Sequence, residues 1–477
     1  MTATLSPQDV RLDLLARREI AILDLREEDP YAKDHPLFAA SLSLSRLELE
    51  ILDRVPRKDA RVVLYDDGEG LVAPAADRLA ALGYTQVFAL AGGLAGWRAA
   101  GYELFQDVNS ASKAFGELVE ARRHTPSLPA PEAKALIETN PDVVVLDARR
   151  FEEYQTMSIP RGVSVPGAEL VLRAQAIAPD PATTIVVNCA GRTRSIIGAQ
   201  SLINAGLPNR VFALRNGTIG WTLAGQDLEH GRDARFPEVT DAAAAQARDR
   251  ARAVAYRAGV KRLTAAELAR LAEEPGRTLY RFDVRTPEEY AAGHIPGFRS
   301  APGGQLVQET DVFAPVRGAR IVLADDRGAR ADMSASWLAQ MGWEVYVLEG
   351  GFDGPLKAGA WRASTPPAPD VPILTPEALA ARADEALVLD VGPSPAHRRG
   401  HIPGARFAIR ARLGEIAARL PAGRTIVVTS PDGLAARFAA AELAALVRAP
   451  VLALDGGTLA WAAEGRPQDT GLTAPLS

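Results

Sequence analysis

The sequence predicts an α/β protein built from four repeats of one domain, each a mainly parallel sheet flanked by helices on both faces. Three observations predict this fold: an apolar run ending in Asp recurs four times, a second apolar run follows each one at a regular distance, and helical patterns lie between such runs. Strands that alternate with helices are typical of parallel sheets, because each crossover helix packs back onto its sheet. A chain of 477 residues is also too long for one core and has room for about three or four domains.

The first shared element of each repeat is a short apolar strand that ends in an aspartate. Its four copies end, in chain order, at Asp24, Asp147, Asp283 and Asp390. In the first three copies an arginine follows two residues later: Arg26, Arg149 and Arg285. The fourth copy has a glycine in that place. Self-similarity of this kind is the mark of a repeated domain.

A second apolar run follows the first in every repeat, and the residue just after it differs between the repeats. That residue is, in chain order, Asp66, Cys189, Asp325 or Ser430. It lies 42 residues after the earlier aspartate in the first three repeats and 40 residues after it in the fourth. So regular a spacing indicates that the four positions are equivalent.

The third shared element is a short strand that runs into a glycine-rich turn and usually a tryptophan. In the second repeat it reads Arg215-Asn216-Gly217-Thr218-Ile219-Gly220-Trp221, and only the third repeat has lost the tryptophan. We expect the tryptophans to pack in the core and the glycines to adopt backbone angles that other residues avoid.

Helices and linkers separate these strands. Apolar residues recur at helical spacing from Ile196 to Ala205, and Gly206 is a natural stop. Bridging helices are expected over 109–123 and 241–258. The expected organisation is unit one 1–105, a helical linker 106–126, unit two 127–230, a helical linker 231–260, unit three 261–364, a stiff Pro-rich linker 365–370 and unit four 371–477.

Composition narrows the class of protein. The net charge of −5 gives no reason to expect nucleic acid as a partner. No run of 18 apolar residues is present, so we expect no membrane span, and the first residues lack the pattern of a secretory signal. One cysteine and six histidines cannot build an internal disulfide or a zinc site of the usual spacing. A reducing cytoplasm is the expected location.

The chemistry is expected in residues 189–195, the Cys189 loop. A thiol at the end of a parallel strand, just before a helix, faces backbone N–H groups, and these together with the helix dipole favour a thiolate and a bound anion. Arg192 and Arg194 add two cations, Thr193 and Ser195 can donate hydrogen bonds, and Ser195 is a plausible N-cap of the helix. The alternative is an inert buried cysteine, which the glycine and the two arginines within five residues disfavour.

The chain resembles tandem domains of the rhodanese (thiosulfate sulfurtransferase) family. The resemblance rests on the Cys189-Ala190-Gly191-Arg192-Thr193-Arg194-Ser195 loop, on the Asp-x-Arg pairs, and on the turns Gly293-His294-Ile295-Pro296-Gly297 and Gly400-His401-Ile402-Pro403-Gly404. It implies that the two histidines are structural. It also implies that Arg149 organises loops beside the site without contacting the substrate.

The resemblance implies a two-step transfer that needs no metal and no organic cofactor. The Cys189 thiolate would take the outer sulfur of thiosulfate, or of a persulfide, and pass it to cyanide, a thiol or a protein acceptor. The N–H groups of residues 190–195 would hold the persulfide, while Arg192 and Arg194 would bind the sulfonate end of the donor.

One departure from the family keeps a second enzyme class open. Many family loops have Gly three residues after the Cys, whereas Gly191 lies two after it. A longer loop suits a phosphate-sized anion, as in the related phosphatases and arsenate reductases. Those phosphatases have Arg six residues after the Cys, where this chain has Ser195, and usually His before the Cys, where it has Asn188.

Units one, three and four lack the nucleophile, because Asp66, Asp325 and Ser430 replace it. They are expected to be structural copies, with a binding role as the alternative: docking of a sulfur donor or acceptor protein, or binding of an allosteric anion. A third class of function also stays open: an interaction scaffold in which Cys189 is vestigial.

Overall fold

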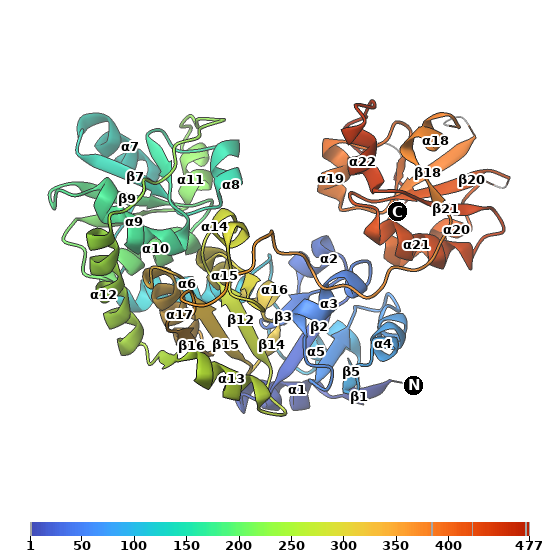
Figure 1. Ribbon diagram of the computed structural model, residues 1–477, viewed down its shortest axis with the longest axis horizontal. Helices are drawn as coiled ribbons and strands as arrows, with labels where there is room; N and C mark the ends of the chain where they lie inside the picture. The colour runs from blue at the N-terminus through green and yellow to red at the C-terminus, as the bar shows by residue number, and fades with distance from the viewer. Residues whose placement is uncertain (1, 383–384, 422, 473–474, 477) are drawn as a thin grey trace.

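Each of the four predicted repeats forms its own sheet in the computed structural model of the chain (Figure 1). The structure describes residues 2–382, 385–421, 423–472 and 475–476. Within these residues the strands of every sheet pair in parallel, except for one antiparallel edge strand that unit three adds to the sheet of unit one. Helices cover both faces of each sheet, so the predicted fold class is confirmed.

Unit one begins the chain. Its strands are β1 (Ala3–Leu5), β2 (Ile20–Asp24), β3 (Ala39–Ser41), β4 (Val62–Tyr65) and β5 (Val87–Leu90). Its helices are α1 (Pro7–Leu15), α2 (Glu28–Lys33), α3 (Leu47–Arg54), α4 (Val72–Ala81) and α5 (Gly93–Ala99). Helix α6 (Ser110–Arg123) then leads to unit two.

Unit two carries the lone cysteine. Its strands are β6 (Ser127–Leu128), β7 (Val143–Asp147), β8 (Gly162–Ser164), β9 (Thr184–Asn188) and β10 (Val211–Leu214). Its helices are α7 (Ala130–Thr139), α8 (Phe151–Thr156), the 3-10 turn η1 (Gly167–Glu169), α9 (Leu170–Ile177), α10 (Thr193–Asn204) and α11 (Gly217–Leu223). The helix predicted after Cys189 is therefore present as α10. Helix α12 (Asp241–Arg257) leads to unit three.

Alternation along the strands of unit two explains its two hydrophobic cores. The strand order is β6-β10-β9-β7-β8, so β9 is the middle strand. Successive side chains of a strand point to opposite faces. Ile185 and Val187 of β9 pack with α9 and α10, whereas Val186 packs on the other face with α7 and Trp221 of α11. Trp221 is buried, as expected for a core tryptophan. The middle strand is thus held from both sides, and the residue after it is fixed in place.

Unit three packs against both of the units before it. Its strands are β11 (Lys261–Leu263), β12 (Leu279–Asp283), β13 (Arg299–Ser300), β14 (Val316–Arg317), β15 (Arg320–Ala324) and β16 (Glu344–Leu348). Its helices are α13 (Ala265–Glu273), α14 (Pro287–Ala292), α15 (Gly303–Gln308), α16 (Thr310–Phe313) and α17 (Ala329–Gln340). Strand β14 pairs with β2 of unit one, and one continuous hydrophobic core contains residues of both units.

Unit four follows an extended segment and lies at the opposite end of Figure 1 from unit two. Its strands are β17 (Ile373–Leu374), β18 (Ala386–Asp390), β19 (Arg406–Phe407), β20 (Thr425–Thr429) and β21 (Val451–Leu454). Its helices are α18 (Pro376–Ala380), α19 (Ser394–Arg399), the 3-10 turn η2 (Arg410–Arg412), α20 (Leu413–Ala417), α21 (Leu434–Ala444) and α22 (Gly457–Ala463).

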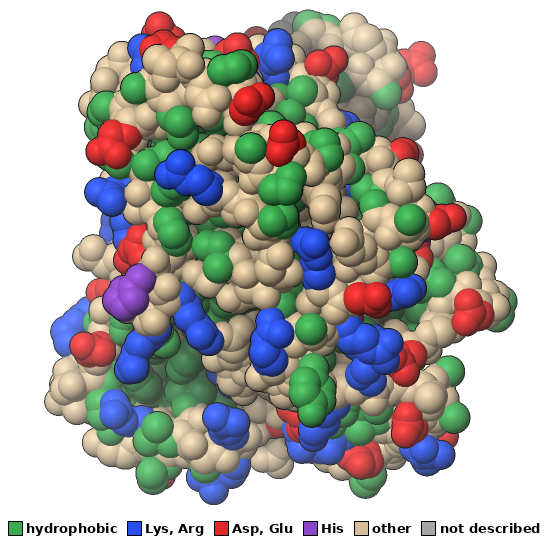
Figure 2. Space-filling view, turned by 90° about the vertical axis from the view of Figure 1, so that its left-hand side faces the viewer, with side chains coloured by type: hydrophobic (Ala, Val, Ile, Leu, Met, Phe, Trp, Pro, Cys, Tyr) green, Lys and Arg blue, Asp and Glu red, His purple; other side chains and the backbone are tan. Residues whose placement is uncertain are grey.

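The outer surface is of mixed charge. Figure 2 shows the face on the side of unit two, where basic and acidic side chains are interspersed. Within the described ranges, every helix is too short or too polar to span a bilayer.

Candidate active site

Cys189 directly follows the middle strand of unit two, and helix α10 begins four residues later. Only 1% of the cysteine is exposed. Among the described residues, none accepts a hydrogen bond from the backbone N–H groups of residues 190–195, and none contacts the thiol by a hydrogen bond. An ideal Cβ built on Gly191 would meet no described atom within 4 Å. The loop therefore presents free donors and open space beside a thiol.

The underside of the Cys189 loop is tied to the start of α11. The N–H of Thr218 donates to the Cys189 carbonyl at 2.9 Å, and the N–H of Ile219 donates to the Ala190 carbonyl at 3.0 Å. Gly217 makes this approach possible, because it has a φ of +51° and its Cβ would lie 2.1 Å from the Cys189 carbonyl oxygen. These two bonds fix the carbonyls of the first two loop residues, while the N–H groups of residues 190–195 have no acceptor among the described residues.

Two of the predicted hydroxyl donors have structural contacts. The expectation that Ser195 caps α10 is wrong, because the helix begins at Thr193 and its N-cap is Arg192. Ser195 lies in the first turn, where its hydroxyl donates to the Arg192 carbonyl at 2.8 Å. Short hydroxyl side chains inside a helix commonly bond to the preceding turn in this way. Thr193 packs against α6, where a Cβ on Gly116 would lie 2.9 Å from its methyl carbon.

Arg149 binds the aspartate that ends β7. Its Nε and one Nη donate to Asp147 at 2.8 and 2.7 Å, and the same Nη donates to the Met157 carbonyl at 2.6 Å. Asn188, just before the cysteine, donates to the same carboxylate at 2.9 Å. Because all three side chains are almost fully buried, this network fixes the end of β9 next to Cys189.

Arg192 points toward the helix that joins units one and two. It makes a two-pronged contact with Glu117 of α6 at 2.7 and 2.9 Å and also pairs with Glu120. The hydrogen bond to Glu117 is the main reason that the pKa of Arg192 lies above its ordinary value. Glu117 and Glu120 were not identified from the sequence, since nothing in an exposed helix shows which loop it will cover. Donor binding by Arg192 remains a prediction.

Arg194 points toward α8 and unit three. Its two Nη atoms contact Glu153 at 2.7 and 2.8 Å, and one of them lies 3.4 Å from Oε1 of Gln305. Burial works to lower the pKa of Arg194, but Glu153 and the negative charge of a Cys189 thiolate outweigh it and raise the pKa. Arg194 is thus a loop cation close enough to Cys189 for the two side chains to interact electrostatically. The sequence analysis identified neither Glu153 nor Gln305. Gln305 comes from another repeat, so no pattern within unit two points to it.

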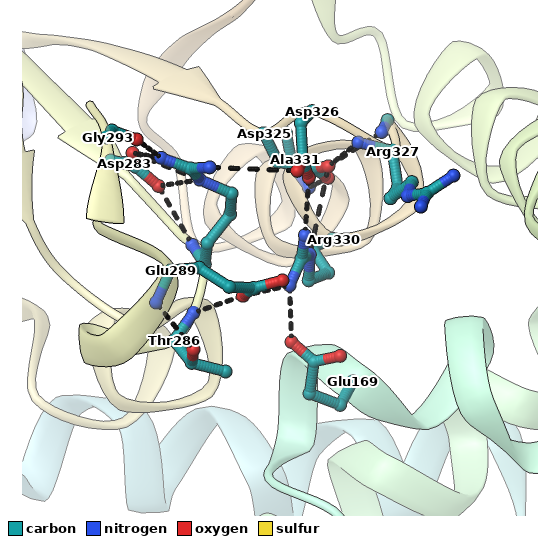
Figure 3. Close-up of polar contacts among 12 residues, drawn as sticks. Glu169, Asp283, Thr286, Glu289, Gly293, Asp325, Asp326, Arg327, Arg330 and Ala331 are labelled. Atoms are coloured by element: carbon teal, nitrogen blue, oxygen red, sulfur yellow. Dashed lines mark hydrogen bonds and ion pairs between the residues drawn. The ribbon is translucent and has the colours of Figure 1, made fainter. Parts of the chain in front are cut away.

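The equivalent loops of units one and three are filled by their own carboxylates. Asp66 accepts the N–H groups of Gly68 and Leu71 at 3.1 and 2.6 Å. Asp325 accepts those of Arg327, Gly328 and Ala331 at 2.5, 2.7 and 2.8 Å (Figure 3).

In unit four the N–H of Ala436 donates to the Ser430 hydroxyl at 3.2 Å. In each silent loop, therefore, the side chain that replaces the cysteine accepts at least one N–H group of that loop. Among the described residues at these four equivalent positions, Cys189 is the one whose side chain accepts no N–H group of its own loop.

Comparisons with known proteins agree with this architecture. The model of the rhodanese-like domain matches residues 7–100, 129–224, 264–357 and 375–464. A thiosulfate sulfurtransferase GlpE from Ectopseudomonas mendocina is 33% identical over 88 residues, which cover 18% of this chain and 71% of that protein. The GlpE of Pseudomonas paraeruginosa is 32% identical over 106 residues, covering 21% of this chain and 84% of that protein.

A solved structure matches along the whole length. The crystal structure of a thiosulfate sulfurtransferase from Pseudomonas aeruginosa has 59% sequence identity and a TM-score of 0.97, covering 100% of this chain and 91% of that one. The four family matches together span well over half of the sequence. The chain therefore belongs to the rhodanese family, as a tandem protein with four rhodanese-like domains.

Proposed function

We propose that this chain is a sulfurtransferase that moves sulfane sulfur from thiosulfate or a persulfide donor to a thiophilic acceptor through a persulfide on Cys189. The observation that carries the proposal is the contrast between the loops: the donors of residues 190–195 are open beside a thiol, whereas Asp66 and Asp325 occupy them in the silent units. The similarity to thiosulfate sulfurtransferases supports the choice of donor.

The first step is attack on the donor. The Cys189 thiolate forms a bond to the outer sulfur of thiosulfate, the sulfur–sulfur bond of the donor breaks, and sulfite leaves with the bonding electrons. Arg194, which interacts electrostatically with Cys189, binds the sulfonate end as negative charge moves onto it. The loop N–H groups hold the outer sulfur of the resulting persulfide, which is anionic.

The second step is attack by the acceptor. Cyanide, a thiol or a protein thiol forms a bond to the outer sulfur, and the electrons of the breaking sulfur–sulfur bond return to Cys189 as thiolate. Cyanide leaves as thiocyanate, and a thiol leaves as its persulfide. Two half-reactions on one residue give ping-pong kinetics. Units one, three and four serve as structural copies in this proposal, and a reducing cytoplasm suits a lone thiol of this kind.

Intact-mass measurement tests the proposal. The purified protein incubated with thiosulfate is expected to gain the mass of one sulfur atom, and added cyanide is expected to remove it as thiocyanate. Cys189→Ser should gain nothing, and because the chain has no other cysteine, that control has no background. No gain with thiosulfate or with any small persulfide would overturn the proposal. Hydrolysis of a phosphate monoester, or reduction of arsenate, would then favour the phosphatase or reductase class, and inactivity toward all of them would favour a scaffold.

A further inference from the structure

Units two and three have corresponding residues at a constant spacing of 136 positions. The corresponding pairs are Cys189 with Asp325, Arg194 with Arg330, Glu153 with Glu289, Glu169 with Gln305, and Arg173 with Glu309. The ion pair between Arg194 and Glu153 recurs between Arg330 and Glu289, at 2.7 and 2.6 Å. The two loops therefore share one arrangement of residues, and their differences can be compared position by position.

The two loop arginines reach across the interface to corresponding partners. Arg330 of unit three contacts Glu169 of unit two at 2.8 Å (Figure 3), and Arg194 of unit two lies 3.4 Å from Gln305 of unit three. The turns that carry these partners meet so closely that a Cβ on Gly304 would lie 2.9 Å from the nitrogen of Gly167. Each unit thus supplies one residue to the other unit's loop arginine.

The two arginines differ in how many carboxylates surround them. Arg330 is fully buried and contacts Glu169, Glu289 and Asp326 at 2.6 to 2.8 Å, with Asp325 at 3.7 Å. Arg194 contacts one carboxylate, and its cross-unit partner is an uncharged amide. Several carboxylates of the protein neutralise the positive charge of Arg330, whereas a single carboxylate, that of Glu153, pairs with Arg194.

Gln305 is held with its oxygen toward Arg194. Its side chain is buried, and its Nε2 donates to Glu309 at 3.0 Å, which leaves Oε1 for the guanidinium. Glu309 is in turn paired with Arg150 of unit two. At the corresponding place Glu169 is flanked by the cation Arg173, 3.0 Å away. The residue that reaches across the interface is therefore a neutral amide for Arg194 and a carboxylate for Arg330.

We propose that Gln305, contributed by unit three, is a specificity-determining residue of the Cys189 site that keeps it selective for anionic sulfur donors. Its neutral amide positions Arg194 without cancelling its charge, so the charge remains available to the sulfonate end of the donor. A carboxylate in its place, as Glu169 provides for Arg330, would make the site resemble the silent one. This inference rests on the proposed function and names the residue that tunes it.

Steady-state kinetics with two donors tests the proposal. Gln305→Glu is made alone and with Glu309→Gln, so that the new carboxylate keeps a hydrogen-bond donor. With cyanide as acceptor, Gln305→Glu should raise the KM for thiosulfate by about tenfold, since a unit charge acts strongly over a few ångströms at a partly buried site. The double variant adds no net charge and only moves a carboxylate from residue 309 to residue 305, beside Arg194, so its KM for thiosulfate should rise by less. The KM for an uncharged organic trisulfide should change by less than about twofold, because a neutral donor does not sense the added charge.

Alkylation of Cys189 gives a readout that does not depend on sulfur transfer. Iodoacetate is anionic and iodoacetamide is neutral, and the two reagents are similar in size. With a single cysteine in the chain, the ratio of their rates reports the charge around that thiol alone. Gln305→Glu should lower the iodoacetate-to-iodoacetamide ratio several-fold. This arm still tests the role of Gln305 if thiosulfate proves not to be a substrate.

Glu169→Gln is the matched control, since it changes the corresponding residue on the side of Arg330. It should leave both the thiosulfate KM and the alkylation ratio within about twofold of the wild type, because the charge it removes faces the silent loop. The proposal is overturned if Gln305→Glu leaves the alkylation ratio unchanged. It is equally overturned if the KM values for the anionic and neutral donors rise together, since a general distortion of the loop would explain that result.

Discussion

The carboxylate of Asp325 accepts a hydrogen bond from the backbone N–H of Ala331, six residues later, at 2.8 Å. The residues at the same two positions of unit two are Cys189 and Ser195. Among the described residues, none accepts a bond from the Ser195 N–H. The silent loops of units one and three therefore bind a carboxylate of their own, Asp66 or Asp325, where the Cys189 loop has a thiol.

The variant Cys189→Asp should make the active loop into a silent one. A carboxylate there can accept two or three N–H groups, and hydrogen bonds to charged groups stabilise by about 1.5–3 kcal/mol each. We expect Cys189→Asp to raise the thermal unfolding midpoint above that of Cys189→Ser and to load no sulfur from thiosulfate. Calorimetry and intact-mass measurement check the two parts. Equal midpoints for the two variants would mean that the loop donors are not a carboxylate site.

The ion pair between Glu153 and Arg194 should make stability depend on pH in a defined window. Burial opposes ionisation of Glu153, but Arg194 outweighs it and lowers the pKa of Glu153 below its ordinary value of 4.5. A lowered carboxyl pKa stabilises the fold above the unfolded-state value, and this contribution is lost as pH falls through the folded-state pKa.

The comparison of the wild type with Glu153→Gln measures this contribution. We expect the variant to be less stable at pH 7, with a difference that stays constant down to about pH 5 and shrinks below pH 4.5. Denaturant unfolding at a series of pH values checks it. A difference that grows on acidification would have the wrong sign for a lowered pKa and would contradict the proposed ion pair.

The fold could be predicted because its signals are local and repeated. A run such as Val144–Asp147 identifies a buried strand by its own composition, and the regular spacing identifies the repeat. The position of Cys189 could be predicted for the same reason. The strand before it and the helix after it are both recognisable from the neighbouring sequence.

The partners of the loop arginines could not be predicted in the same way. Glu117 contacts Arg192 from a linker helix, and Gln305 contacts Arg194 from another unit more than 100 residues away. Such contacts depend on how whole units pack, and no periodicity in one unit encodes that packing. The prediction of the N-cap of α10 was wrong for a simpler reason. Serine is a favoured N-cap residue, but the helix begins two residues before Ser195.

Gly217→Ala should abolish activity, because the loop has no room for a Cβ there. The new atom would lie 2.1 Å from the Cys189 carbonyl oxygen, and the residue has a φ of +51°. We expect loss of sulfur loading and a destabilisation of several kcal/mol, as for overpacked sites with strained backbone.

Gly225→Ala is the matched control, since Gly225 also has a positive φ, +70°, but its Cβ would meet no described atom within 4 Å. It should cost about 1 kcal/mol and retain sulfur loading. Intact mass after thiosulfate treatment and thermal unfolding are measured for both variants. A Gly217→Ala protein that loads sulfur normally would show that the carbonyl of Cys189 need not be held in its present place.

Arg410→Ala should loosen unit four from unit one without affecting the Cys189 site. Arg410 is 1% exposed in its side chain and contacts Glu48 of unit one at 2.9 and 3.0 Å, while Glu442 of its own unit lies 2.5 Å away. Removing one partner of a buried ion pair costs up to about 3–5 kcal/mol, and less is expected here because Glu48 and Glu442 keep Arg78 as a partner at 3.3 and 2.9 Å. Since residues 362–372 have no helix or strand, a protease of broad specificity should cut this segment faster in the variant.

Arg412→Ala serves as the control for Arg410→Ala, because Arg412 is two residues away but exposed, and its ion pair is with Glu415 of its own unit. Exposed ion pairs contribute about 0–1 kcal/mol, so its cleavage rate should match that of the wild type. Both variants should transfer sulfur at the wild-type rate, since unit four contributes no residue to the Cys189 contacts described above. Equal cleavage rates for Arg410→Ala and Arg412→Ala would contradict a docking role for Arg410. A loss of sulfur transfer in Arg410→Ala would instead show that unit four acts on the Cys189 site through unit one.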